Sequence, residues 1–329
     1  MRLSPLTPQY FSSSPGIESA CRRLFWITAL ILLIILVLFW EPLRGAGLIE
    51  TLVALTYSQA WLEVIIRSIT FLGDEEFFLI LLPIVYWSVN KPLGFWSSVV
   101  LISATLITSE IPKDITRLPR PDIEIVDTPP TYTFPSGHTS GAVGVWGYMA
   151  VRLKSVKFWV WALAAMILVG VSRMMLGVHF AGDVLGGFLA GMLYLAVFVR
   201  ISRLLQDERW DQKIPFGWLL VIAAAVPLAM SFIPATYAPR LMGYIAGGGL
   251  GYALDWKYLK FLTGGSPFQH PARAMLGIAV LFVIVSELGS VIPSGHITVF
   301  LHYALAGIWV TYLAPALFVK LGLSKREED

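Results

Sequence analysis

The chain has 329 residues, of which 57% are hydrophobic and only 14% are charged, and its mean hydropathy is +0.73. Soluble globular domains carry about a quarter charged residues, so the composition excludes that class and indicates an all-α, polytopic membrane protein. The net charge of +3 is small and the basic residues are scattered, which argues against nucleic-acid binding, and the single cysteine excludes an intrachain disulfide.

The N-terminal part combines a polar segment with a first membrane helix. Residues 1–20 are rich in Ser and Pro and lack periodicity, so we expect a mobile tail, within a cytoplasmic segment 1–23. The apolar run 24–40 is too long for the core of a cleavable signal peptide and lacks a small-residue cleavage site, so it is interpreted as a membrane span. Charged residues then interrupt 45–76, which favours amphipathic or membrane-surface helix.

Five further membrane helices are expected before residue 203, and together with the first they form a six-helix core over residues 24–203. The first two of these five form a hairpin joined around Lys91-Pro92, and the earlier one is short for a span of about 20 residues. A polar, proline-rich segment separates this hairpin from the remaining helices. The expected helices cover 77–90, 93–111, 137–151, 158–175 and 183–199.

The C-terminal part is expected to be an additional membrane region. The charged stretch 206–213 marks a boundary, so residues 204–215 are interpreted as a linker and 216–329 as about four additional transmembrane helices. These four spans are expected near 216–232, 241–254, 274–291 and 297–318.

The distribution of Lys and Arg orients the predicted spans, because translocated loops are poor in these residues. With ten spans and both termini in the cytoplasm, most of the basic clusters face inward. The three polar runs described next then lie on the external, periplasmic or lumenal face, and ligand binding would explain their cations. The inward clusters are Arg22-Arg23, Lys91, Arg152 with Lys154 and Lys157, Arg200 with Arg203, Lys257 with Lys260, and Lys320 with Lys325.

The first polar run extends from Lys113 to Pro121 and carries Lys113 and Arg120. Prolines within it restrict the backbone and so limit where the side chains point. An ammonium and a guanidinium held in this way can bind different oxygens of one phosphoryl group. Taken alone, the run equally suits an anchor to lipid headgroups.

The second run is Pro135-Ser136-Gly137-His138. Ser136 and Gly137 stand at a predicted helix start, where backbone N–H groups and the helix dipole favour an anion, and His138 would lie beside that anion. An N-cap serine with an incidental histidine is the competing interpretation of this tetrapeptide.

The third run reaches from Ser172-Arg173 through His179 to Asp183. Its last two residues are spaced i and i+4 at the start of a span, which predicts that they share one helical face. Asp183 would then accept a hydrogen bond from Nδ1 of His179 and leave Nε2 free to attack. A polar pair that caps a helix near the membrane surface is the alternative.

Together, these runs resemble the three-part signature of the type 2 phosphatidic acid phosphatase superfamily. The matching pattern is Lys, six residues, Arg-Pro; then Pro-Ser-Gly-His; then Ser-Arg, five residues, His, three residues, Asp. All three parts match in order, and the resemblance covers roughly residues 77–199. The first run looks closest to the sphingoid-base phosphate phosphatase branch, and the extra C-terminal helices depart from the minimal six-helix form.

The resemblance implies a role for each polar residue. His179 would attack phosphorus to form a phosphohistidine while Asp183 orients it, and His138 would protonate the leaving oxygen and then help to activate water. Lys113, Arg120 and Arg173, with backbone donors near Ser136 and Gly137, would stabilise the phosphoryl oxygens. The scheme needs no metal or other cofactor, and the sequence offers no carboxylate cluster for Mg²⁺.

The predicted function is hydrolysis of a lipid phosphate or lipid diphosphate by an integral membrane enzyme. The motifs leave the lipid open: phosphatidic acid, phosphatidylglycerophosphate, a sphingoid-base phosphate and a polyprenyl diphosphate are all candidates. A lipid phosphotransferase with the same intermediate, or a lipid-phosphate transporter or flippase, are the alternative functions. Nothing in the sequence indicates an oligomeric state.

Two other patterns are given structural interpretations. Pro293-Ser294-Gly295-His296 repeats the second run, but neither a Lys…Arg-Pro run nor a Ser-Arg…His…Asp run accompanies it, so it is interpreted as a helix start. Glycines after the third run and in 247–251 are expected to allow close helix packing, which near the third run would hold His179 next to its partners.

Overall fold

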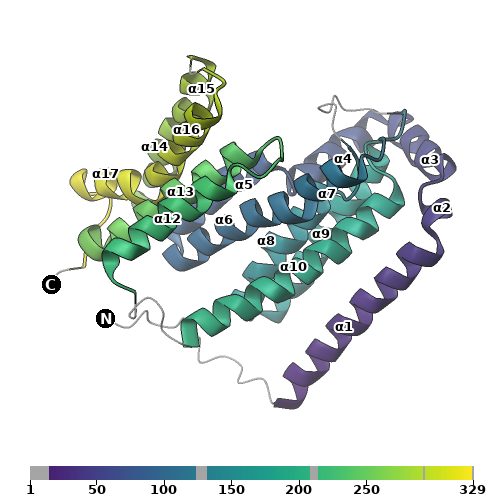
Figure 1. The fold of residues 1–329 in the computed structure, drawn as a ribbon, viewed down its shortest axis with the longest axis horizontal. Helices are drawn as coiled ribbons and strands as arrows, with labels where there is room; N and C mark the ends of the chain where they lie inside the picture. The colour runs from purple at the N-terminus through teal and green to yellow at the C-terminus, as the bar shows by residue number, and fades with distance from the viewer. Residues whose placement is uncertain (1–14, 124–131, 208–213, 292, 328–329) are drawn as a thin grey trace.

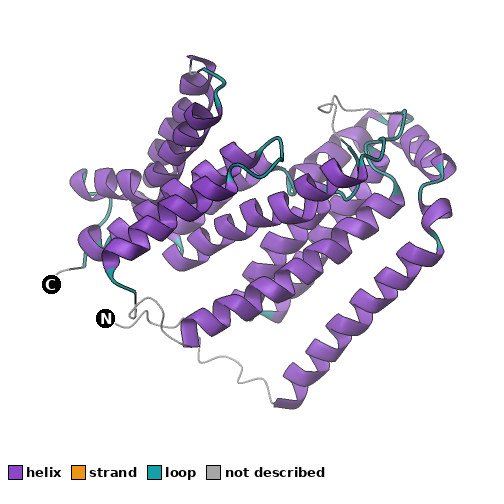
Figure 2. Ribbon diagram, viewed as in Figure 1, coloured by secondary structure: helices purple, strands orange, loops and turns teal. Residues whose placement is uncertain are grey.

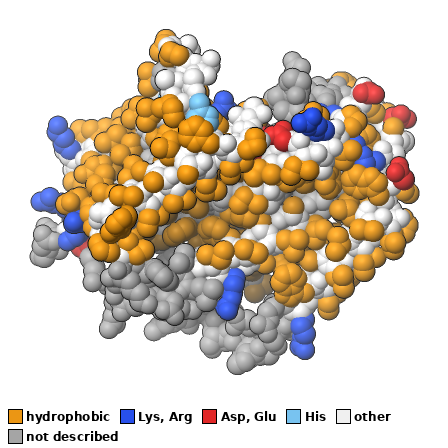
Figure 3. All heavy atoms as spheres, viewed as in Figure 1, with side chains coloured by type: hydrophobic (Ala, Val, Ile, Leu, Met, Phe, Trp, Pro, Cys, Tyr) orange, Lys and Arg blue, Asp and Glu red, His pale blue; other side chains and the backbone are white. Residues whose placement is uncertain are grey.

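The computed structural model describes residues 15–123, 132–207, 214–291 and 293–327, and every regular element in these residues is a helix (Figure 1, Figure 2). The predicted all-α class is therefore confirmed. Large hydrophobic side chains such as Leu30, Val160 and Val221 are at least half exposed, which in a soluble protein would be costly. Figure 3 shows hydrophobic side chains over most of the face in view, as expected for a surface that contacts lipid.

The N-terminal helices are α1 (Pro15–Leu38), α2 (Trp40–Leu43), α3 (Ala46–Tyr57) and α4 (Ala60–Phe71). The predicted mobile tail is wrong for residues 15–20, which form the start of α1. Proline is well tolerated in a first helical turn, where its missing N–H has no intrahelical partner, so Pro15 can begin the helix. Residues 1–14 lie outside the described part of the chain.

The chain turns sharply after α1, and the two parts of the bent pair Arg23–Leu38 and Trp40–Tyr57 meet at 93°. The predicted surface-helix character of 45–76 agrees with the short helices α3 and α4, which contact α9 (Val156–Met175). These short helices lie at the same end of the molecule as α7 (Ile111–Thr116) (Figure 1).

The predicted hairpin is formed by α5 (Glu75–Ser88) and α6 (Lys91–Thr105). The second of these continues into α7 through η1 (Leu106–Glu110), a π-helical turn; the label η marks such turns throughout. Asn90 begins α6 because its side chain accepts a hydrogen bond from the N–H of Leu93 at 2.8 Å. The turn therefore precedes Lys91 instead of including it. The predicted polar segment 112–135 is helical in its first residues, because α7 extends to Thr116, and residues 124–131 lie outside the described residues.

The centre of the core is α8 (Gly137–Leu153), which packs against α6, α9 and α10 (Ala181–Asp207). Every residue from Thr139 to Ala150 is buried, so all sides of this helix are covered by protein. A Cβ atom at Gly147 would lie 2.5 Å from the Leu195 side chain of α10. The small side chains of α8 thus bring three neighbouring helices close to it.

The C-terminal helices are α12 (Phe216–Met230), α13 (Ala238–Leu254), η2 (Asp255–Leu259), α14 (Gln269–Phe282), η3 (Val283–Glu287), α15 (Leu288–Val291), α16 (His296–Ile308), η4 (Trp309–Leu313) and α17 (Ala314–Lys320). They pack against the core through α5 and α6. The indole N–H of Trp87 on α5 donates to the Val310 carbonyl at 2.7 Å, and the Arg273 guanidinium donates to the Trp87 carbonyl at 2.7 Å. Of the predicted linker 204–215, residues 204–207 continue α10 and 208–213 lie outside the described residues.

All ten predicted spans coincide with helices. Within the described residues, five helices are long and apolar enough to cross a membrane, or six if the bent pair counts as one span. The predicted spans 77–90, 137–151, 216–232 and 241–254 lie in helices of 14, 17, 15 and 17 residues, which are shorter. The chain is therefore a multi-pass membrane protein, while the total of ten spans stays a prediction.

Candidate active site

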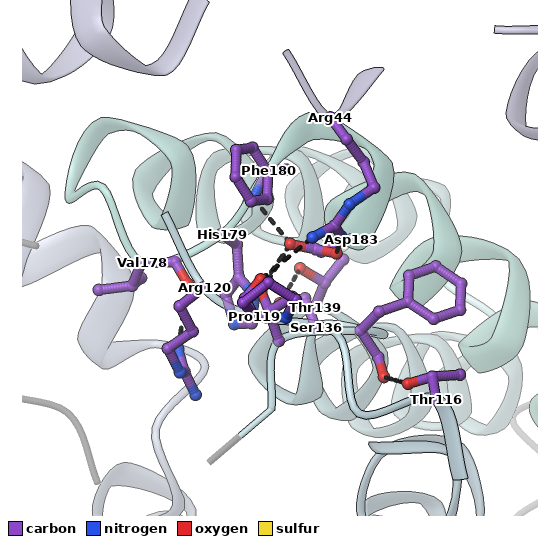
Figure 4. Close-up of polar contacts among 12 residues, drawn as sticks. Arg44, Thr116, Pro119, Arg120, Ser136, Thr139, Val178, His179, Phe180 and Asp183 are labelled. Carbon is purple, nitrogen blue, oxygen red and sulfur yellow. Dashed lines mark hydrogen bonds and ion pairs between the residues drawn. The ribbon is translucent and has the colours of Figure 1, made fainter. Parts of the chain in front are cut away.

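The three polar runs meet at one end of the core. They are carried by the end of α7, the start of α8 and the connection between α9 and α10. The backbone N–H of Ser136 donates to the Asp183 carbonyl at 3.0 Å, which ties the second run to the third. Arg120 of the first run donates to the Val178 carbonyl at 3.0 Å, one residue before His179 (Figure 4).

The His179–Asp183 pair differs from its predicted geometry. His179 lies in the connection before α10 instead of on the helix, and its Nδ1 is 3.7 Å from Oδ2 of Asp183, too far for a direct hydrogen bond. The Thr133 hydroxyl bridges the two groups. It donates to Oδ2 of Asp183 at 2.6 Å and lies 3.0 Å from Nδ1 of His179, where its oxygen can accept a hydrogen bond from the ring N–H.

Asp183 is completely buried, and several groups compensate its charge. Nη1 of Arg44 lies 2.8 Å from Oδ1, and the backbone N–H of Phe180 donates to Oδ2 at 2.8 Å. Figure 4 shows Arg44 and Phe180 on either side of this carboxylate. Arg44 also lies 4.6 Å above the Phe180 ring and donates to the Pro119 carbonyl at 3.0 Å, so it joins the first and third runs.

Arg44 and Thr133 were missed by sequence reasoning. A signal for Arg44 was present, because the predicted topology places it after the first span on the external face, against the charge bias. Thr133 carries no comparable signal, since a threonine in a proline-rich segment is ordinary in composition. Its role depends on the path of the chain through 132–136.

The environment of His179 keeps its imidazole neutral. Burial lowers the pKa of His179 to about 3, the charges of Arg173 and Arg120 act in the same direction, and Asp183 opposes them. A neutral ring has a free lone pair on one nitrogen. Because Thr133 occupies Nδ1, that lone pair is on Nε2, which is the nitrogen expected to attack.

The predicted phosphate-binding cations lie close enough to the two histidines for their charges to act on them. Arg173 at the end of α9 is buried and donates to the Thr70 hydroxyl at 2.9 Å. Lys113 forms an ion pair with Glu110 at 3.2 Å, one turn earlier on the same helix. The charge of Arg173 acts on both imidazoles, and that of Arg120 acts on both His179 and Lys113.

Ser136 and Gly137 occupy the start of α8, as predicted. Ser136 is the N-cap residue, but its side chain makes no capping hydrogen bond and instead accepts one from the Thr139 hydroxyl at 3.0 Å. A Cβ atom at Gly137 would lie 2.6 Å from Oγ of Ser109 and 3.6 Å from Nζ of Lys113. Glycine therefore lets the start of α8 approach the first run closely.

His138 has a partner that the sequence analysis did not assign. Its Nε2 lies 2.6 Å from Oδ1 of Asp74, the N-cap residue of α5, and both side chains are partly exposed. Asp74 was interpreted only as one of the charges that interrupt an amphipathic segment. Its spacing from His138 in the chain, 64 residues, left no local pattern to detect.

Comparison with known proteins places this site in a family. Residues 94–207 match the model of the PAP2 superfamily, and the chain is 32% identical over 152 residues to phosphatidylglycerophosphatase B of Bacillus subtilis, covering 43% of this chain and 75% of that protein. The chain belongs to the PAP2 superfamily. The predicted resemblance to the type 2 phosphatidic acid phosphatases is thereby confirmed.

The additional C-terminal helices also match a PAP2 model. Residues 239–326 match the PAP2 superfamily phosphatase transmembrane extension, which here comprises α13 to α17. Most of the region that departs from the minimal six-helix form, from α13 onward, therefore matches a transmembrane extension of PAP2 phosphatases.

Further PAP2 relatives include eukaryotic enzymes. The chain is 26% identical over 247 residues to a probable sphingosine-1-phosphate phosphatase of Dictyostelium discoideum, covering 67% of this chain and 57% of that protein. It is 25% identical over 244 residues to mouse sphingosine-1-phosphate phosphatase 1, covering 68% of this chain and 54% of that protein. The chain therefore spans little more than half the length of these two relatives.

A solved PAP2 structure is also similar. The crystal structure of the transmembrane PAP2 type phosphatidylglycerolphosphate phosphatase of Bacillus subtilis aligns with a TM-score of 0.41 and 24% identity, over 57% of this chain and 97% of that one. Membership of the family supports a membrane lipid phosphatase.

Proposed function

We propose that the protein hydrolyses a lipid phosphate ester through a phosphohistidine on His179, without a metal ion. The observation that carries this proposal is the state of His179. Its ring is buried, which lowers its pKa, Nδ1 contacts the Thr133 hydroxyl that in turn donates to Asp183, and Nε2 is left to react near the cations of the first and third runs. This arrangement suits a nucleophile for phosphorus held by an orienting carboxylate.

In the first step, Nε2 of His179 attacks phosphorus, so an N–P bond forms and the ester P–O bond breaks. The leaving oxygen takes the bond's electron pair and accepts a proton from His138. The ring of His179 becomes positively charged, and this charge is stabilised by Asp183 through the Thr133 hydroxyl. In the second step, water attacks phosphorus, His138 takes the proton of that water, and the N–P electron pair returns to His179.

The phosphoryl group carries negative charge that must be neutralised in both transition states. Lys113, Arg120 and Arg173 are assigned this role, with backbone N–H groups at the start of α8 near Ser136 and Gly137. Preorganised cations and dipoles supply most of the catalysis in phosphoryl transfer. These groups perform the charge neutralisation for which other phosphatases use metal ions.

The proposed substrate is a lipid whose headgroup lies at the membrane surface. The site is built at helix ends, with α7 finishing and α8 and α10 beginning there, so a phosphate can reach it while the tail stays in the bilayer. Phosphatidylglycerophosphate and sphingosine-1-phosphate, which the names of the relatives contain, are the first substrates to test, followed by phosphatidic acid and a polyprenyl diphosphate. We place the site on the external face, with both termini in the cytoplasm.

Phosphate release by purified protein from these four lipids, measured in EDTA, tests the proposal. The wild type should turn over at least one lipid, and His179→Gln should lose nearly all activity while remaining folded. A matched control is His296→Gln, in the other Pro-Ser-Gly-His sequence, which should keep wild-type turnover. Unchanged turnover in His179→Gln would refute the assigned nucleophile, and a strict requirement for added divalent metal would refute the metal-free mechanism.

A further inference from the structure

Two histidines of the site are paired with carboxylates through opposite ring nitrogens. In His179 the engaged nitrogen is Nδ1, which faces Thr133 and Asp183. In His138 it is Nε2, which lies 2.6 Å from Oδ1 of Asp74. The first arrangement leaves Nε2 with a lone pair, whereas the second leaves Nδ1 as the atom that can exchange a proton with a ligand.

Asp74 is held in position by its place in the fold. It is the N-cap residue of α5, and its backbone N–H donates to the Phe71 carbonyl at 3.1 Å while its carbonyl accepts from the N–H of Phe78 at 3.3 Å. The preceding residue, Gly73, packs against α8 and α9, because a Cβ there would lie 3.4 Å from the His138 carbonyl and 2.6 Å from the Val169 side chain. The turn between α4 and α5 is thus pressed against the start of α8.

The same turn supports a second site residue. Thr70, at the end of α4, accepts a hydrogen bond from the buried guanidinium of Arg173 at 2.9 Å. Residues 70–74 therefore contact both a cation and a histidine of the site, although they lie outside all three polar runs. This segment is a fourth part of the site.

We infer that Asp74 is the positioning residue that holds His138 through Nε2 and so directs Nδ1 toward the leaving oxygen, while its charge favours the protonated ring that donates there. This inference rests on the proposed phosphatase function. The pKa of His138 is lowered to about 4, first by burial and then by the charges of Arg173 and Lys113, and only the hydrogen bond and the charge of Asp74 oppose this shift. Loss of the Asp74 charge would favour the neutral ring further, and a neutral ring that carries its proton on Nε2 has none to donate from Nδ1.

The inference predicts an effect that depends on the leaving group. An alkoxide leaving group needs a proton, whereas a phenolate leaves without one, so loss of the acid should slow only the alkyl ester. Asp74→Asn keeps the size and one acceptor oxygen but removes the charge. We expect its kcat for dodecyl phosphate to fall by about 10- to 100-fold and that for 4-dodecylphenyl phosphate to stay near the wild-type value.

The pH profile provides a second measurement on the lipid ester alone. His138 must be protonated to act as an acid, so removal of the Asp74 charge should move the high-pH decline of kcat to lower pH. Asp74→Glu keeps the carboxylate and should restore part of the rate and of the wild-type profile. Glu76→Gln removes the same charge from the first turn of α5 without contact to His138, and it should behave as the wild type.

The outcomes separate this inference from the proposed function. Absence of lipid phosphatase activity in the wild type would refute the proposed function itself. The role of Asp74 alone would be overturned by a different result. In that case the wild type would depend on His179, but Asp74→Asn would be equally slow on both esters and would show an unshifted pH profile. Thermal unfolding of each variant in detergent shows which losses come from misfolding.

Discussion

The pairing of His179 with Asp183 was only partly predictable from the sequence. Their identity and spacing indicated a nucleophile with an orienting carboxylate, and the structure brings the two side chains together. The direct hydrogen bond between them was predicted wrongly, because His179 precedes α10 and its Nδ1 lies 3.7 Å from Asp183. Thr133 completes the connection from a distant part of the chain.

Loss of the Thr133 hydroxyl should slow catalysis. Thr133→Val keeps the shape of the side chain but removes the hydroxyl, so His179 loses its orienting partner. We expect kcat for the lipid substrate to fall on the order of 100-fold, as expected for a misplaced nucleophile. Thr116→Val is the control, because Thr116 donates to the Phe134 carbonyl of the same segment and contacts neither His179 nor Asp183. Equal losses in the two variants would mean that Thr133 only tethers the segment.

Protonation of His179 can be measured directly. Its pKa is lowered by burial from 6.5 to about 3, so the ring should be neutral at pH 5 in the folded protein but charged in the unfolded chain. The unfolded state then binds more protons, and His179 lowers the stability of the fold as pH falls below 6.5. Nitrogen NMR of ¹⁵N-histidine protein, with His179→Gln to assign the signal, should show a neutral Nδ1–H ring at pH 5. An imidazolium signal at that pH would contradict the proposed environment.

Among the helices, each predicted span coincides with a helix of the structure, because a long apolar run is visible in the sequence. The ends of helices were less predictable, since they depend on caps such as Asn90 and on neighbouring elements. The role of the short helices was not visible at all. The turn between α4 and α5 supplies Thr70 and Asp74 to the site, and only its packing against α8 and α9 reveals this.

The glycines after the third run confirm the expected close helix packing. Gly186, Gly187 and Gly191 of α10 are in tight contact, with Cβ positions 2.4 Å from the Phe134 ring, 2.7 Å from the Ser136 carbonyl oxygen and 2.9 Å from the Val143 side chain. Gly182 has only ordinary contacts, the nearest at 3.5 Å. Close packing of α10 therefore holds the segment that contains the second run, as expected near His179.

A glycine in the C-terminal region gives a test of close packing. A Cβ at Gly247 of α13 would lie 1.8 Å from the Ala304 carbonyl oxygen of α16, so Gly247→Ala must push the two helices apart. We expect a cost of about 1 to 3 kcal/mol in the free energy of unfolding. The control Gly217→Ala, on α12, adds a methyl group where nothing lies within 4 Å. The thermal midpoint in detergent should fall only in the first variant, and equal midpoints would refute the tight crossing.

For the whole molecule, the predicted inward clusters can be compared with the fold. Lys91 pairs with Asp255 at 2.7 Å, and the N–H of Leu262 donates to the Lys325 carbonyl at 2.8 Å. Three clusters that are far apart in sequence therefore lie together, at the opposite end of the helix Lys91–Thr116 from the site. This grouping gathers three of the predicted inward clusters at one end of the molecule, while the side of the membrane on which they and the site lie stays a prediction.

The orientation in the membrane can be tested by cysteine labelling. Cys21 is the only cysteine, so a Cys21→Ser background accepts single cysteines at exposed positions. Asp122→Cys, in the loop of the first run, should react with a membrane-impermeant maleimide in intact cells or sealed vesicles. Lys154→Cys, at the far end of α8, should react only after permeabilisation. The reverse pattern would place the site on the cytoplasmic face.

Composition and apolar runs indicated the membrane class and where the helices lie, and the three polar runs indicated the candidate site residues. Apolar length and side-chain chemistry are local properties, so they can be read without a fold. The groups that complete the candidate site are brought in by packing between distant segments: Arg44 and Thr133 beside Asp183, Thr70 beside Arg173, and Asp74 beside His138. These partners are ordinary residues in their own segments, and only the packing of distant helices places their polar atoms within hydrogen-bonding distance of the site.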